Sequence, residues 1–169
     1  RLPRLTERAP MPIDPRHVGR KYGPFRYVAA LEKIRDFALA VSDGIPGHVS
    51  WGGGPADVHP WSVDEAAGRA SPWGSVIAPP TFCVNFAMEP FARACSDRAV
   101  GLDLVRLLHG EQEFTFHEPV RPGDELETVG EIAQVYQKGP LDFMVVKTVT
   151  RNQHGRLVVE GRWTAVVRN

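Results

Sequence analysis

The last third of the chain alternates apolar and polar residues over long stretches, and this feature constrains the fold most. Three segments have the period of two that is typical of strands with one buried face, namely Leu126–Val135, Leu141–Thr150 and Leu157–Val167. Turn-forming residues precede the first segment at Pro122–Asp124 and separate the last two at Asn152–Gly155. Connections this short join neighbouring antiparallel strands, so the pattern predicts an antiparallel meander.

The first half of the chain has helical periodicity instead. Between Ala30 and Val41, apolar residues recur every three or four positions, which predicts an amphipathic helix, and Phe25–Val28 before it suggests a short strand. A second helix is expected from Pro79 to Cys95, kinked at Pro90. It is apolar on nearly all sides, which indicates burial. Helices followed by a meander predict an α+β domain in which a curved sheet wraps an apolar helix.

Shorter elements are expected between these parts. A brief helix is plausible over Ser62–Ala70, where Ser62 and Glu65 fit a capping box. Phe114 and Phe116 alternate with polar residues and indicate a fourth strand. Residues 12–23 have no clear period, and the long Gly- and Pro-rich stretch 44–75 is expected to be a functional loop or disordered.

Composition limits the class of protein. A chain of 169 residues is the size of one domain, and we expect residues 11–169 to form it, with residues 1–10 as a disordered leader or a remnant of cloning before Met11. Twenty basic residues balance twenty acidic ones, which disfavours nucleic acid or an anionic membrane as the general partner. No apolar run has membrane-spanning length, and two cysteines make no disulfide framework. We therefore expect a cytoplasmic protein.

A carboxylate and an imidazole stand five residues apart where the first helix ends. Asp43 and His48 flank Gly44, Pro46 and Gly47, which are residues of a tight turn. Such a pair can hold one water molecule and move its protons. The spacing also fits an ordinary helix-ending turn followed by a solvated histidine.

Three segments together resemble the MaoC-like hydratases and dehydratases, a family with the hot-dog fold. The stretch Ser42–His48 is similar to that family's Gly-Asp-x-Asn-Pro-(Ile/Leu)-His, although Ile45 replaces Asn and Gly47 the branched residue. Phe116–Asp124 resembles the Phe-x-x-Pro-Val-x-x-Gly-Asp signature. Val76–Phe82 is similar to the start of the central helix in the subgroup of N-terminal MaoC-type dehydratase domains. The resemblance covers about residues 17–168.

The resemblance implies an (R)-type 2-enoyl-CoA hydratase or 3-hydroxyacyl-thioester dehydratase of fatty acid metabolism. Asp43 and His48 would be the catalytic acid and base, and the helix start at Pro80, Thr81 and Phe82 would face the thioester carbonyl, with amides as oxyanion donors. Prolines have no N–H, so Thr81 and Phe82 are the first possible donors. No metal or redox cofactor is implied, and coenzyme A or a carrier protein is the handle of the substrate.

Other assignments of these residues stay open. A non-catalytic or partner-dependent subunit of a hetero-oligomeric dehydratase would have the same fold, and either a homodimer or a heterodimer with another hot-dog subunit is implied. A hot-dog thioesterase would use a carboxylate on the central helix, for which Glu89 is the candidate. His48, Asp57 and His59 are weak candidates for a metal site, and Ser42 for a nucleophile. Gly52–Gly54 lacks the context of a phosphate loop.

Overall fold

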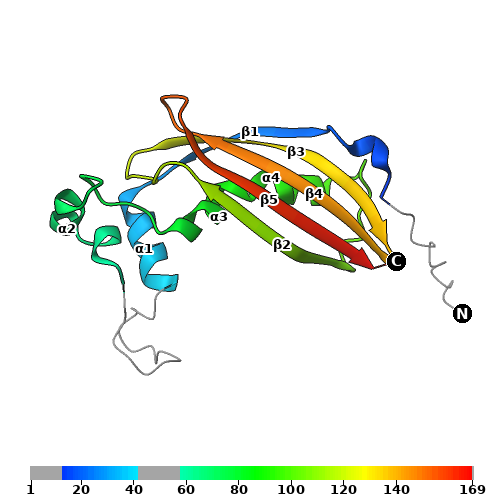
Figure 1. The fold of residues 1–169 in the computed structure, drawn as a ribbon, viewed down its shortest axis with the longest axis horizontal. Helices are drawn as coiled ribbons and strands as arrows, with labels where there is room; N and C mark the ends of the chain where they lie inside the picture. The colour runs from blue at the N-terminus through cyan, green and yellow to red at the C-terminus, as the bar shows by residue number, and fades with distance from the viewer. Residues whose placement is uncertain (1–12, 42–57, 169) are drawn as a thin grey trace, which may run out of the picture.

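The computed structural model describes residues 13–41 and 58–168, and within them a curved antiparallel sheet wraps around a helical layer. The five strands are β1 (Lys21–Val28), β2 (Leu107–Phe116), β3 (Glu125–Lys138), β4 (Leu141–Arg151) and β5 (Leu157–Arg168). They lie in the order β1-β3-β4-β5-β2, so that β1 and β2 form the two edges (Figure 1). All neighbouring strands are antiparallel. The predicted α+β architecture is confirmed.

The central helix is divided into three consecutive pieces. A 3₁₀ turn over Pro80–Cys83 leads into α3 (Val84–Ala87) and then α4 (Glu89–Ser96). The division between α3 and α4 falls next to Pro90, because proline cannot continue the hydrogen bonding of a helix interior. Pro90 packs against the sheet where Gly130 has no side chain, since a Cβ there would lie 2.4 Å from the Pro90 Cβ. The expected kink is thus confirmed as a break.

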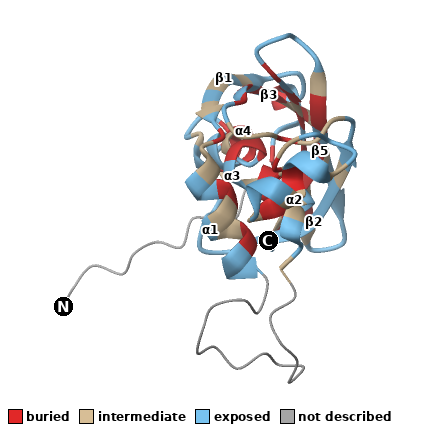
Figure 2. Ribbon diagram, turned by 90° about the vertical axis from the view of Figure 1, so that its left-hand side faces the viewer, coloured by how far each residue is buried: buried red, intermediate tan, exposed pale blue. Residues whose placement is uncertain are grey.

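The core lies between the sheet and this helical layer (Figure 2). Trp163 of β5 is its largest fully buried side chain, stacked on Phe91 of α4, and its indole nitrogen donates to Thr148 Oγ1 at 3.0 Å. Phe82 packs edge-on against Phe37 of α1 (Leu31–Val41), which joins the first helix to the same core. Cys83 and Cys95 are both buried and free.

Several local predictions need correction. The helix expected over Ser62–Ala70 is α2 (Glu65–Ala70), preceded by a 3₁₀ turn over Pro60–Ser62. Asp64 caps it, because the Asp64 carboxylate accepts the Ala67 N–H at 2.7 Å, so the predicted Ser62 capping box is wrong. Strand β1 begins at Lys21 rather than Phe25, and a register shift between Tyr22 and Phe25 accommodates Gly23 and Pro24.

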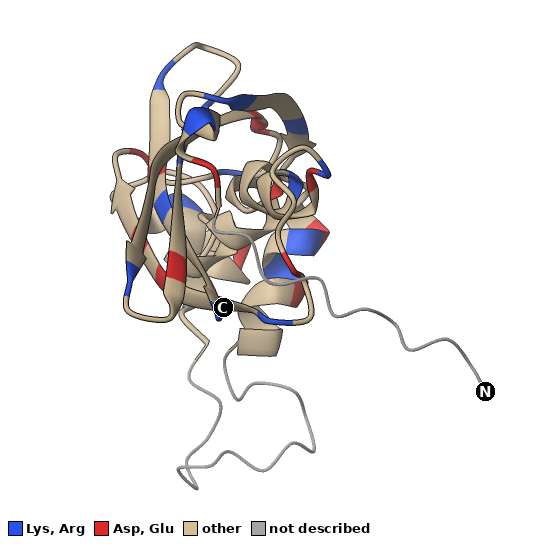
Figure 3. Cartoon of the chain, turned by 90° about the vertical axis from the view of Figure 1, so that its right-hand side faces the viewer, with Lys and Arg blue, Asp and Glu red and all other residues tan. Residues whose placement is uncertain are grey.

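Charged residues are spread over the surface rather than gathered on one side. Ribbon segments coloured for Lys and Arg are interspersed with segments coloured for Asp and Glu in Figure 3, in agreement with the balanced composition. None of the helices in residues 13–41 and 58–168 is long and apolar enough to cross a membrane.

Candidate active site

The segment just before the central helix is held by two hydrogen bonds from different parts of the chain. The Ala78 N–H donates to the Val120 carbonyl at 2.9 Å, and the Ile77 N–H donates to the Trp61 carbonyl at 3.1 Å. Backbone bonds of this kind fix a segment that has no regular structure of its own. The start of the central helix is therefore positioned by the turn that follows β2 and by the segment that leads into α2.

The turn Arg121–Asp124 explains why the Pro-Val-x-x-Gly-Asp pattern ends in glycine and aspartate. The Asp124 carboxylate accepts the Arg121 N–H at 2.8 Å, and Gly123 has a φ of +87°, which favours glycine. The Gly123 N–H donates to the Ala29 carbonyl at 2.8 Å, and the Ala29 N–H donates to the Asp124 carbonyl at 2.9 Å. The acidic residue of this signature thus closes a turn and ties it to the junction of β1 and α1.

The three residues predicted at the helix start occupy different environments. Thr81 is exposed, and its N–H has no hydrogen-bond partner among the residues described. The Phe82 N–H donates to the Pro79 carbonyl at 2.9 Å, and the Phe82 ring is buried between Tyr27, Phe37 and Phe86. Pro80 lines two cavities. Of the two amides considered in the sequence, that of Thr81 is the available donor.

An apolar cavity of about 300 Å³ lies on one side of this segment. Its wall combines the central helix, the signature turn, the end of β2 and the start of β5. It is lined by Trp73, Ile77, Ala78, Pro79, Pro80, Cys83, Phe86, Phe116, His117, Glu118, Pro119, Val120, Val158 and Val159. Burial raises the pKa of the Cys83 thiol to about 12, so that this group stays protonated and acts as an apolar wall rather than a nucleophile.

A second cavity of about 360 Å³ lies on the other side of the same segment. It is bounded by the end of α1 and by the residues around the 3₁₀ turn before α2, and shares Ile77, Ala78, Pro79 and Pro80 with the first cavity. Val41 and Val58 both line it. These are the described residues on either side of positions 42–57, so Asp43 and His48, like Ser42, Gly52–Gly54 and Asp57, lie outside the described residues.

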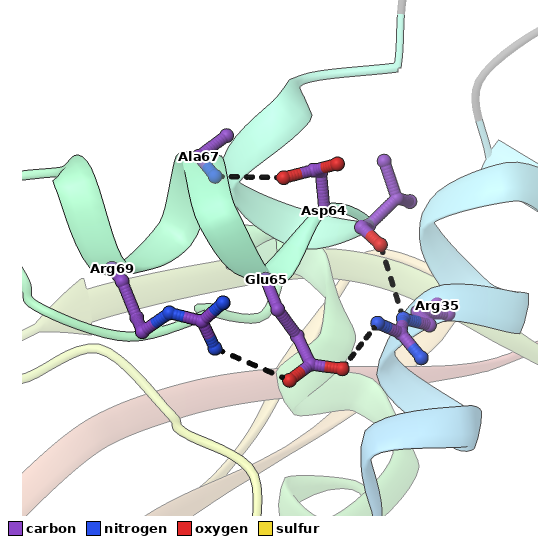
Figure 4. A network of polar contacts seen from close by, with 6 residues as sticks. Arg35, Asp64, Glu65, Ala67 and Arg69 are labelled. Carbon is purple, nitrogen blue, oxygen red and sulfur yellow. Dashed lines mark hydrogen bonds and ion pairs between the residues drawn. The ribbon is translucent and has the colours of Figure 1, made fainter.

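A polar network holds the wall of the second cavity to α1. Figure 4 shows Arg35 of α1 reaching the α2 region, where its Nε donates to the Val63 carbonyl at 3.0 Å and a terminal nitrogen pairs with Glu65 at 3.0 Å. Arg69 contacts the other oxygen of Glu65 at 3.4 Å. Arg35 therefore joins the residues before and after the 42–57 segment.

Two residues considered for other chemistries have structural roles here. Glu89 forms an ion pair with Arg93 at 2.8 Å on the outer side of α4 and lines neither cavity. The His59 ring accepts the Trp61 N–H at 3.3 Å as the cap of a 3₁₀ turn and packs edge-on against the Trp61 ring. Within residues 13–41 and 58–168, no group of three or more His, Cys, Asp or Glu side chains has the arrangement of a metal site.

The rim of the first cavity includes polar residues that the sequence did not single out. His117 pairs with Glu160 of β5 at 2.9 Å, and Glu118 pairs with Arg156 at 3.1 Å. His117 and Glu118 are the two variable positions of the Phe-x-x-Pro-Val pattern, which is the signal that would have pointed to them. Together they add polar groups to the wall of an otherwise apolar cavity.

Comparisons with known proteins match almost the whole chain. The family described as "FAS1-like, dehydratase domain region" matches residues 16–161. A UPF0336 protein of Saccharopolyspora erythraea is 35% identical over 159 residues, covering 94% of this chain and 93% of that protein. Another UPF0336 protein, from Streptomyces griseus, is also 35% identical over 159 residues, which make up 94% of this chain and 97% of that protein.

Solved structures give the same result for the fold. A chain of the HadBC (3R-hydroxyacyl-ACP dehydratase) complex of Mycobacterium tuberculosis has a TM-score of 0.71 and 26% identity, over 89% of this chain and 96% of that one. A MaoC-like dehydratase with 27% identity has a TM-score of 0.74 over 90% of this chain and 42% of its own length. The (R)-hydratase of A. caviae, at 19% identity, has a TM-score of 0.61 over 88% of this chain and 94% of that one.

Proposed function

Because the chain belongs to the FAS1-like dehydratase-region family of MaoC-like hot-dog proteins, we propose that it is a hydro-lyase acting on acyl thioesters. The reaction is hydration of a 2-enoyl thioester to the (R)-3-hydroxyacyl thioester, or its reverse. The carbonyl of the thioester acidifies the α-carbon, which is what makes addition and loss of water at the neighbouring carbon feasible. Family membership supports the class of reaction, and the cavities support the kind of substrate.

The observation that carries the proposal is the pair of cavities on either side of residues 77–80. The first is apolar and suits an acyl chain, and the second adjoins the segment that contains Asp43 and His48. Asp43 follows Val41 by two residues, and two residues of chain span at most about 7 Å. We therefore assign the acyl chain to the first cavity and the water to the second. The thioester group would then lie between the two cavities, at Pro80 and Thr81.

The proposed chemistry needs one water molecule and two proton carriers. In hydration, one member of the Asp43 and His48 pair removes a proton from water as its oxygen bonds to the β-carbon, and the other delivers a proton to the α-carbon. Acid–base catalysis of this kind contributes about 10²- to 10⁴-fold to the rate. The carbonyl oxygen gains negative charge in between, and the donor assigned to it is the Thr81 amide, which has no partner among the described residues.

The reaction involves no net oxidation or reduction, and the side chains of Asp43 and His48 supply its acid and base. The proposal therefore assigns no metal and no redox cofactor to the site. Coenzyme A or a carrier protein enters as part of the substrate and leaves unchanged.

A partner-dependent subunit is the second candidate. The HadBC and ChsH1–ChsH2 structures of Mycobacterium tuberculosis are complexes, and this chain is 26% identical to a chain of the first. The replacements at Ile45 and Gly47 concern the turn that carries the acid–base pair. In this alternative, the chain contributes the acyl cavity and a second hot-dog subunit catalyses the reaction.

The decisive assay is the loss of enoyl absorbance when the purified protein meets crotonyl-CoA and a longer 2-enoyl-CoA. We expect Asp43→Asn and His48→Ala each to lower kcat at least 100-fold. Asp36→Asn, on the exposed side of α1, and His154→Ala, in the hairpin between β4 and β5, are the matched controls and should keep wild-type rates. A folded wild type with no turnover would instead favour the partner-dependent subunit.

The cavity assignment has its own test. Cys83→Met adds volume to the apolar wall, so we expect it to raise KM for the longer enoyl-CoA at least tenfold while crotonyl-CoA is still turned over. Cys95→Met enlarges the other buried cysteine, which lies outside this cavity, and should leave the ratio of the two substrates unchanged. An equal loss with both substrates would contradict the assignment.

A further inference from the structure

The first cavity is bordered by two aromatic rings that are about half exposed. Among the described residues, the exposed Phe, Trp and Tyr side chains are those of Trp73, Phe116 and Tyr136. Two of these three line the first cavity, Trp73 at 43% exposure and Phe116 at 50%. Large apolar rings are mostly buried in proteins, so exposed rings gathered at one cavity indicate a surface that a ligand covers.

The two rings are held by different parts of the chain. Trp73 lies in a turn after α2, where its N–H donates to Ser71 Oγ at 3.2 Å and the Gly74 N–H donates to the Ser71 carbonyl at 3.0 Å. Phe116 ends β2, and its ring packs against Phe114 at a centroid distance of 5.8 Å. The Trp73 ring packs against no other aromatic ring of the described residues. Two separate aromatic faces are thus presented to one cavity without covering each other.

The remaining wall of this cavity is rigid. The Phe86 ring is buried, with its centroid 5.7 Å from that of Tyr27 and 6.4 Å from that of Phe82. Val158 and Val159 of β5 are 2% and 1% exposed. Rigid rings are also contributed by three prolines, Pro79, Pro80 and Pro119. None of the described lining residues is Met, whose flexibility lets a pocket adapt to varied ligands. The cavity therefore selects its ligand by shape.

A flat ring suits such a wall better than a flexible chain does. A long alkyl chain loses the freedom of many rotatable bonds when it is ordered in a cavity, whereas a ring is rigid before it binds. Aromatic rings also attract one another in offset and edge-on arrangements beyond the effect of buried area. The polar side chains of the wall are already paired, His117 with Glu160 and Glu118 with Arg156. The fitting ring is therefore apolar.

We propose that Trp73 and Phe116 determine specificity by binding an apolar aryl group at the far end of the acyl chain, so that aryl-substituted acyl thioesters are the preferred substrates. The inference rests on the proposed function for the reacting end of the substrate and adds the recognition of its other end. Loss of one aromatic contact changes a dissociation constant about two- to tenfold.

The test compares two saturated thioesters with equal numbers of acyl carbons, 5-phenylpentanoyl-CoA and undecanoyl-CoA, by titration calorimetry. Binding driven by apolar area alone favours undecanoyl-CoA, which has the larger apolar surface. We expect the wild type to bind 5-phenylpentanoyl-CoA at least fivefold more tightly. Trp73→Leu and Phe116→Leu should each remove most of this preference, whereas Trp73→Phe should retain it because an aromatic face remains.

The matched control is Tyr136→Leu. Tyr136 is the third exposed ring, stacks on Phe143 at 4.8 Å and lies outside the first cavity, so this variant should keep the wild-type ratio of the two dissociation constants. A wild type that binds undecanoyl-CoA as tightly or more tightly would overturn the proposal. A Trp73→Leu variant that keeps the wild-type ratio would overturn the role of Trp73.

The binding measurement is independent of the proposed reaction. Saturated thioesters have no double bond to hydrate, so their dissociation constants do not depend on turnover. A protein that prefers the phenyl compound but leaves crotonyl-CoA unchanged would support the aryl site and contradict the hydratase assignment. A protein that hydrates crotonyl-CoA without this preference would contradict the aryl site alone.

Discussion

The five-stranded sheet and the α2 segment, defined as residues 58–76, are stabilised by different forces. The sheet buries Trp163, Val146 and Ile132 completely against the central helix. The α2 segment keeps most of its side chains exposed and is attached through Arg35. Burial of large apolar side chains contributes several kcal/mol per residue, whereas exposed ion pairs contribute at most about 1 kcal/mol. The sheet therefore sets global stability, and the α2 segment shapes the second cavity at little energetic cost.

The largest expected difference is between two tryptophans. Trp163→Ala removes a fully buried ring and should lower the free energy of unfolding by about 3–5 kcal/mol. Trp73→Ala removes a ring that is 43% exposed and should lower it by less than about 1 kcal/mol. Urea denaturation followed by circular dichroism measures both, and equal losses would contradict the division between the two regions.

Two glycines give the next comparison. A Cβ at Gly130 would lie 2.4 Å from the Pro90 Cβ, and one at Gly68 would lie 2.6 Å from the Val76 nitrogen. We expect Gly130→Ala to destabilise the whole fold by about 1–3 kcal/mol. Gly68→Ala should instead displace α2 from residues 75–76, with a smaller shift in the urea midpoint.

The readout for Gly68→Ala is hydrogen exchange together with hydratase rate. Exchange should increase in residues 58–78 and not in β3 to β5, and the rate should fall because Ile77 and Ala78 lie directly after the displaced backbone. Uniform exchange across the chain would show that α2 and the sheet unfold as one unit.

Arg35→Ala is expected to have a smaller effect. It removes one hydrogen bond to the Val63 carbonyl and a partly exposed pair with Glu65, so the loss in stability should be less than about 1 kcal/mol. Its effect should be local, seen as faster exchange in the α2 segment. The control Arg93→Ala breaks the Glu89 pair on α4 and should leave that exchange unchanged.

The smallest expected effect is on the pH dependence of stability, and it concerns Tyr22 of strand β1. Burial, followed by the Asp97 hydrogen bond, raises the pKa of Tyr22 to about 12. A tyrosine whose pKa is higher in the folded state costs nothing at neutral pH, but stability falls as pH rises above 10, where the unfolded chain ionises first.

Tyr22→Phe should therefore reduce the loss of stability between pH 9.5 and 11, measured by urea midpoints. Part of the loss of stability should remain in the variant, because burial also raises the pKa values of Cys83 and Cys95 to about 12. An identical pH dependence in the two proteins would show that Tyr22 ionises equally well in the folded state.

The sequence predicted the elements whose periodicity is set by a buried face. β4 and β5 alternate regularly and were found within two residues of their ends. The first seven residues of β2 were missed, because an edge strand with a bulge between His109 and Glu111 and mostly exposed side chains has no alternation to detect. The cap of α2 was assigned to the wrong residue because Ser62 and Asp64 both fit an N-cap. In the structure Ser62 ends the 3₁₀ turn that begins at Pro60, and Asp64 is the cap.

The candidate site was predictable only in part. The assignment of Pro80, Thr81 and Phe82 to the thioester carbonyl stays a prediction: Pro80 lines both cavities, and the sequence could not show that the Phe82 amide is used within its own turn. The assignment of Asp43 and His48 stays a prediction, since both lie outside the described residues. The pairs His117 with Glu160 and Glu118 with Arg156 join residues distant in sequence and have no local pattern.

The turn at Arg121–Asp124 has a consequence for how related sequences are interpreted. Its aspartate closes the turn, and the neighbouring Val120 carbonyl holds Ala78 at the start of the central helix. None of these contacts involves an acid–base group of the proposed reaction. The turn therefore serves the fold whether or not the acid–base pair is present, and we expect this signature to mark the scaffold rather than the activity.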